Sequence, residues 1–142
     1  MLKHDLSTSD RDFRAAFEAG AYAPADFSHR AHVRLAYIYL AESGEDQAYE
    51  RMRTALVSFL AHHGIPATKY HETLTRAWLL GVNHFMHRSP DASSADDFIE
   101  RNPLLLDSRI MLTHYSAELL FSDDARAAFV EPNLDPIPRY TA

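Results

Sequence analysis

The chain of 142 residues contains no cysteine. Disulfide frameworks, thiolate zinc sites and iron–sulfur clusters are therefore excluded, and a reducing compartment fits. Long apolar runs are missing too, since no stretch approaches the roughly 18 apolar residues that a membrane-spanning helix needs. The first residues, MLKHDLSTSDRDF, lack the apolar core of a signal peptide. These absences together predict a soluble, cytoplasmic protein with no membrane partner.

Basic residues are outnumbered by acidic ones. Fourteen Lys and Arg against 20 Asp and Glu give a formal net charge of −6, which repels phosphate backbones, so nucleic acid is not an expected partner. The patterns G-x-G-x-x-G, Walker A, H-E-x-x-H and G-x-S-x-G are also absent. The common sequence signs of nucleotide binding, zinc peptidases and serine hydrolases are therefore missing.

Glycine is scarce, with only four residues. Gly20, Gly44 and Gly64 fall where apolar helical patterns end, which is the usual place for a left-handed glycine that closes a helix. Ser9 and Ser28 are the expected N-caps of the first two helices. The pattern predicts four helices, at about residues 9–19, 29–42, 45–63 and 68–88.

Apolar residues make up 46% of the chain, enough to bury a core. After the fourth helix the sequence predicts shorter helices and then a tail that holds three of the seven prolines. We expect one all-α domain over residues 1–142, a single-domain helical bundle. Its four-helix core would span about residues 9–88, and C-terminal helices with a proline-rich strap would cover about residues 94–138.

Histidine is abundant, with nine residues. Short connections favour antiparallel neighbours, so the second and fourth helices should run parallel and share one end of the bundle with the end of the third. Five histidines fall at that end: His29, His32, His62, His63 and His71. Helical periodicity turns His29, His32 and His71 inward, His63 less clearly, and His62 away.

These histidines suggest a metal site. A helix N-terminus disfavours imidazolium, and a neutral ring can ligate a metal or act as a base. His29 and His32, three residues apart, and His71 from a neighbouring helix are the candidate ligands of a divalent zinc or iron ion. Glu72 is the nearest carboxylate, although an exposed ion pair with Arg76 explains it equally well.

Without metal, the same end of the bundle would use His71 as acid or base, oriented by Thr75 or Tyr70. Arg30 and Arg34 could hold an anionic substrate, with Trp78 as the aromatic contact. The plain alternatives are a solvated face for the arginines and a core position for the tryptophan.

Two functions follow from this interpretation. The first is a small-molecule- or metal-binding domain with a histidine-lined site at one end of the bundle, with catalysis left open. The second is a non-catalytic interaction module, in which the histidines are structural and an apolar surface around Tyr37, Tyr39 and the C-terminal helices docks another protein or forms a homodimer.

Three blocks of the sequence resemble a family of small, uncharacterised bacterial all-helical proteins. The blocks are FSHRAHVRLAYIYL, KYHETLTRAWLL and ARAAFVEPNLDPIP, and the resemblance covers about residues 25–138. It implies a helical fold, but it brings no activity, cofactor or catalytic residue.

Overall fold

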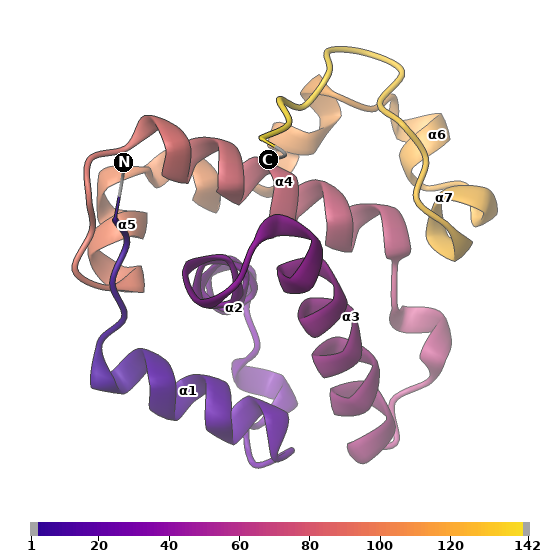
Figure 1. Cartoon of the computed structure of the whole chain (residues 1–142). Coiled ribbons are helices and arrows are strands. Elements are labelled where there is room, and N and C mark those ends of the chain that lie inside the picture. The colour runs from indigo at the N-terminus through magenta and orange to yellow at the C-terminus, as the bar shows by residue number, and fades with distance from the viewer. Residues whose placement is uncertain (1–2, 141–142) are drawn as a thin grey trace.

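The computed structural model of the chain describes residues 3–140, which are helical with no strand in that range. The expected all-α fold and helical bundle are therefore confirmed. The four longer helices are α1 (Thr8–Glu18), α2 (His29–Glu42), α3 (Glu45–His62) and α4 (Glu72–Arg88). Three short helices follow, α5 (Ala95–Arg101), α6 (Ala117–Leu120) and α7 (Asp123–Ala127), as Figure 1 shows.

Side-chain caps decide where the helices begin. The Ser28 hydroxyl accepts a hydrogen bond from the backbone of Ala31, so α2 starts where the sequence predicted. The expected Ser9 cap of α1 is wrong, because Ser7 and Asp10 form a reciprocal capping box that starts the helix two residues earlier.

The start of α4 also differs from the prediction. Residues 67–69 form a separate 3₁₀ turn and Tyr70 is extended, so the helix begins at Glu72 and not near residue 68. His71 is therefore the N-cap of α4 and lies outside its first turn.

Two of the three glycines behave as expected. Gly20 and Gly64 follow α1 and α3 with φ angles of 74° and 66°, in the left-handed region. A Cβ atom on Gly20 would lie 2.5 Å from the ring of His62, so this glycine also permits close approach of the two helix ends. The expectation for Gly44 is wrong, because its φ of −72° places it as the N-cap of α3.

Helix α2 forms the centre of the molecule. Residues 35–40 are all buried, with Tyr37 and Tyr39 fully inaccessible to solvent. Their hydroxyls donate to the Asp5 carbonyl and to the Glu18 carboxylate, which satisfies both buried phenols. The suggested docking surface around Tyr37 and Tyr39 is therefore wrong, because both side chains belong to the core.

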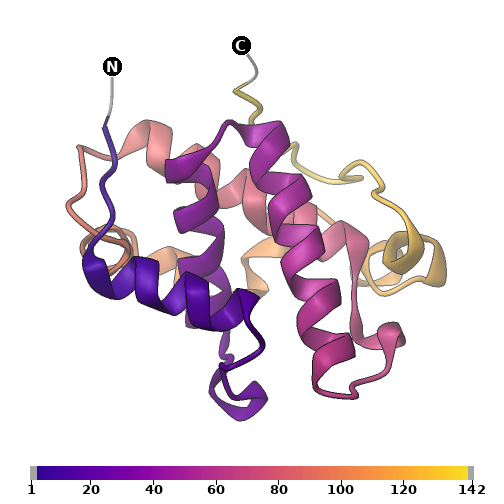
Figure 2. The ribbon, with the colours of Figure 1, turned by 60° about the horizontal axis from the view of Figure 1, so that its bottom comes forward.

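The helices cross at steep angles. Helix α2 is seen end-on in Figure 1 and upright in Figure 2, whereas α1 and α4 lie across the view in both. The expectation that α2 and α4 run parallel is therefore wrong. The N-terminal ends of both helices nevertheless border one cavity, which is described below.

The buried carboxylate of Asp10 links α1, α2 and α5. It accepts hydrogen bonds from the backbone of Ser7 (3.0 Å) and Ala95 (2.9 Å) and from the Arg34 guanidinium (3.1 Å). Burial alone would raise the pKa of Asp10, but these donors outweigh it and hold the pKa below its ordinary value.

The C-terminal segment packs along α4. The Thr73 hydroxyl donates to the carbonyl of Ala128 and accepts from the backbone of Val130. In the proline-rich tail Ile137 is buried, whereas Leu134 is 52% exposed, so only one of these side chains anchors the strap. Within residues 3–140, no helix combines the length and the apolar character that crossing a membrane requires.

Candidate functional site

A cavity of about 630 Å³ opens where the first turns of α2 and α4 meet the last turns of α3. This volume lies in the range of small-molecule sites. Its wall is largely apolar, formed by side chains that include Phe27, Leu56, Phe59, Leu74, Trp78 and Leu120. The segment Ser108–Thr113, a 3₁₀ turn, and the exposed Phe121 complete the rim.

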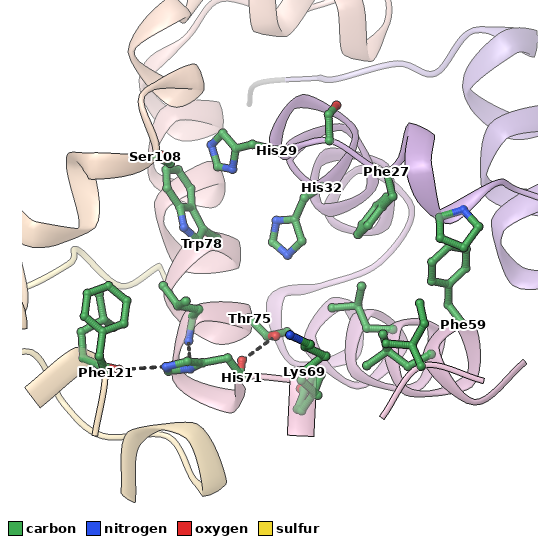
Figure 3. Close-up of a pocket in the computed structure, with 18 of the residues that line it drawn as sticks. Phe27, His29, His32, Phe59, Lys69, His71, Thr75, Trp78, Ser108 and Phe121 are labelled. Atoms are coloured by element: carbon green, nitrogen blue, oxygen red, sulfur yellow. Dashed lines mark hydrogen bonds between the residues drawn. The ribbon is translucent and has the colours of Figure 1, made fainter. Parts of the chain in front are cut away.

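Six of the eight side chains singled out in the sequence line this cavity: His29, His32, Tyr70, His71, Thr75 and Trp78. They come from α2, from α4 and from the segment before α4, and Figure 3 labels all of them except Tyr70. The structure therefore brings together residues that lie more than 40 positions apart in the sequence.

Arg30 and Arg34 are not part of the wall. Arg30 pairs with Asp96 at 2.9 Å on the surface, and Arg34 pairs with the buried Asp10 at 3.0 Å. The expectation that these two arginines hold a substrate is wrong, because both guanidinium groups already have carboxylate partners on other faces of the fold.

His71 performs a structural role. Its Nδ1 accepts a hydrogen bond from the backbone of Leu74 at 3.1 Å, and its Nε2 donates to the carbonyl of Leu120 at 2.8 Å (Figure 3). Burial lowers the pKa of His71, so the neutral tautomer that these two bonds require is favoured. With both ring nitrogens occupied, His71 has no lone pair for a metal ion or a proton, and its expected role as ligand or base is wrong.

The neighbours of His71 fit the same interpretation. The Thr75 hydroxyl donates to the backbone carbonyl of His71 at 2.8 Å, so it does not orient the imidazole. The Tyr70 hydroxyl is buried with no hydrogen-bond partner among residues 3–140, and burial raises its pKa to about 12. Tyr70 is thus a neutral donor in the cavity wall and not a partner of the histidine ring.

The expected metal site does not form. In the part of the chain that the structure describes, no three His, Asp or Glu side chains are grouped so that they could hold a metal ion. Glu72 is buried and bonded to Arg53 (3.2 Å) and to the Tyr49 hydroxyl, so the predicted exposed pair with Arg76 is also wrong.

His29 and His32 differ in their bonding. The Nε2 of His29 donates to the carbonyl of Leu105 at 2.9 Å, and its ring meets the indole of Trp78 edge-on, with 4.5 Å between centroids. The imidazole of His32 has no hydrogen-bond partner within residues 3–140, and Figure 3 shows this ring directed into the cavity. The two imidazoles are nearly parallel, with centroids 6.5 Å apart.

His32, whose imidazole has no partner within residues 3–140, is neutral at physiological pH. Burial, and to a smaller extent the neighbouring His29, lowers the pKa of His32 to about 4. A neutral imidazole offers one donor and one acceptor nitrogen. His32, like the Tyr70 hydroxyl, can therefore form a hydrogen bond with a bound molecule.

Sequence reasoning missed Lys69, Ser108 and Arg109, which also line the cavity. Lys69 falls on a solvent-facing stripe if the fourth helix begins at residue 68. Residues 67–69 form a 3₁₀ turn outside α4, and the side chain of Lys69, although exposed to solvent, lies along the cavity wall (Figure 3). Ser108 and Arg109 belong to a 3₁₀ segment whose position no local pattern reveals.

The other histidines serve elsewhere. His63 contacts Phe59 with tilted rings whose centroids are 4.6 Å apart, but it does not line the cavity. His87 stacks on Tyr140 at 4.1 Å, and the Nδ1 of His114 donates to the carbonyl of Asp135. The contacts of His87 and His114 hold the C-terminal strap against the rest of the fold.

Comparisons of the chain with protein-family models, curated proteins and solved structures find no match. The resemblance to small bacterial helical proteins therefore stays a prediction, and the function has to be argued from the cavity.

Proposed function

We propose that this protein binds a small, largely apolar molecule in the cavity, with the neutral imidazole of His32 as its hydrogen-bonding anchor. The observation that carries the proposal is the combination of about 630 Å³ of space, a mainly apolar wall and one imidazole without a protein partner. Binding sites for small molecules share this design, in which apolar walls supply affinity and a few polar groups fix orientation.

The contents of the wall favour binding over group-transfer chemistry. The hydroxyl of Thr75 and both ring nitrogens of His71 are used in bonds to the backbone. A nucleophile and its base need to be hydrogen-bonded to one another, and the cavity side chains within residues 3–140 show no such pair. We therefore propose ligand binding and no catalysis. We also propose that the protein acts in the cytoplasm, a reducing compartment that the lack of cysteine fits.

A fluorescent apolar probe tests the proposal directly. N-phenyl-1-naphthylamine is uncharged and emits strongly only in apolar surroundings, and Trp78, the single tryptophan, lies in the cavity wall as an energy donor. We expect one probe per chain, with energy transfer from Trp78. Light scattering of the same sample reports whether two copies of the chain associate.

Two matched variants locate the probe. Leu74→Trp places a larger side chain in the cavity wall, whereas Leu104→Trp makes the same change at a 63% exposed position outside it. The first should weaken probe binding about tenfold or more, and the second should leave it unchanged. Absence of probe binding, or equal binding by Leu74→Trp and the unmodified protein, would contradict the proposal.

A further inference from the structure

The charges around the cavity are unlike those of the whole chain. The chain has an excess of acidic residues, 20 against 14. Among the described residues that line the cavity there is no Asp or Glu, whereas two cationic side chains, Lys69 and Arg109, are present. The site thus presents positive charge on a protein whose net charge is −6.

The two cations are not equally available. Arg109 is held by Asp107, with its Nε 3.0 Å and its terminal nitrogen 3.2 Å from the two carboxylate oxygens. Lys69 has no ion-pair partner within residues 3–140, and Figure 3 shows its side chain along the cavity wall. The uncompensated charge at this site is therefore that of Lys69.

Neighbouring groups reinforce this positive potential. Since burial lowers the pKa of His32 to about 4, its imidazole adds no charge at neutral pH and leaves the charge of Lys69 unchanged. The N-terminal ends of α2 and α4 border the same space and contribute partial positive charge. An ammonium group placed beside Lys69 would be repelled by its positive charge.

We propose that the ligand of this cavity carries an anionic group, in the simplest case a carboxylate, that pairs with Lys69 while its apolar body lies against Trp78. This inference rests on the proposed binding function and adds the chemical class of the ligand. A carboxylate at Lys69 forms a charge-assisted hydrogen bond, and the aromatic side chains that line the wall suit a ring or a hydrocarbon chain.

Three probes of one shape and different charge test the inference. They are 1-naphthaleneacetic acid, 2-(1-naphthyl)ethanol and 2-(1-naphthyl)ethylamine, each titrated separately by calorimetry at low salt. We expect the acid to bind about fivefold or more tightly than the alcohol, and the amine to bind most weakly. The preference for the acid should shrink as salt is added.

The two lysines of the chain provide a matched pair of variants. Lys69→Met should abolish the preference for the acid, so that the ratio of the affinities for the acid and the alcohol falls to about one. Lys3→Met removes the other lysine, whose position is outside the cavity wall, and should behave as the unmodified protein. Arg109→Met should have a small effect, because Asp107 already neutralises that charge.

The outcomes separate this inference from the function on which it rests. Binding of the neutral probe with no preference for the acid would overturn the anionic class and leave the binding function intact. A preference that survives Lys69→Met would overturn the assignment to this lysine. If none of the naphthyl compounds binds and the neutral probe also fails, both proposals are wrong.

Discussion

Replacement of His71 separates a structural histidine from a functional one. His71→Ala removes the N-cap of α4, a loss of about 1 kcal/mol, and leaves the carbonyl of the buried Leu120 without its donor, which costs a further 1–3 kcal/mol or so. We therefore expect the free energy of unfolding to fall by about 2–4 kcal/mol. His71→Asn keeps a good capping side chain but cannot reach Leu120, so it should lose about half as much.

Urea denaturation followed by circular dichroism measures these losses, with His87→Ala as the control on the same helix. That change removes an exposed ring that stacks on Tyr140 and should cost less than about 1 kcal/mol. The probe N-phenyl-1-naphthylamine should still bind His71→Ala under conditions in which the variant is folded. A His71→Ala protein with full stability and no probe binding would refute the structural role argued above.

Two further predictions concern acid and a buried carboxylate. Burial lowers the folded-state pKa of His32 to about 4, below the unfolded value of about 6.5, so its contribution to stability is present above pH 6.5 and is lost as pH falls toward 4. The loss should reach about 2 kcal/mol at pH 5, and denaturation of His32→Gln over the same pH range should lack it. Asp10→Ala leaves the guanidinium of Arg34 and the backbone of Ala95 without their acceptor and should cost about 3 kcal/mol or more. Asp12→Ala, an exposed change in the same helix, should cost under about 0.5 kcal/mol, and equal losses in thermal melts would contradict the linking role of Asp10.

The all-helical architecture was predictable because its signals are local. Apolar periodicity placed α2 and α3 to within one residue, and the Ser28 cap was correct. Two predictions of helix ends were wrong because two local signals compete at each position. Ser7 and Ser9 both resemble caps, and only the reciprocal bond with Asp10 selects Ser7. Gly44 resembles a helix end, but it begins α3 because α2 closes at Ser43 in an extended conformation.

The sequence predicted some of the residues that line the cavity, but it predicted the wrong arrangement of the helices that carry them. The histidines at the ends of α2 and α4 do share one wall, although the two helices cross and do not run parallel. Which histidine is free could not be read from the sequence, because the partner of His71 is a carbonyl 49 residues away and that of His29 is 76 residues away. Long-range hydrogen bonds of this kind decide which ring is available to a ligand, and the spacing of residues along a helix does not predict them.

The neutrality of the histidines also has a different cause from the expected one. From the sequence, the helix dipole was expected to keep these rings neutral, but the effect of the dipole is modest and fades within one turn. In the structure the main cause is burial, which lowers the pKa of both His32 and His71. Burial depends on packing against distant segments, so its effect on His32 became visible only once the cavity wall was assembled.

The N-cap hydrogen bond of His71 occupies its Nδ1 and also affects where Lys69 lies. Because His71 caps α4, the helix cannot continue toward its N-terminus, and residues 67–69 turn away as a separate 3₁₀ unit. In a helix continued to residue 68, Lys69 would share a face with Thr73 and Arg76 and would point toward the C-terminal segment, which covers Thr73. The same cap therefore explains why the lysine lies along the cavity wall (Figure 3). His71 thus supports ligand recognition through the backbone, while His32 and Lys69 are the side chains that meet the ligand.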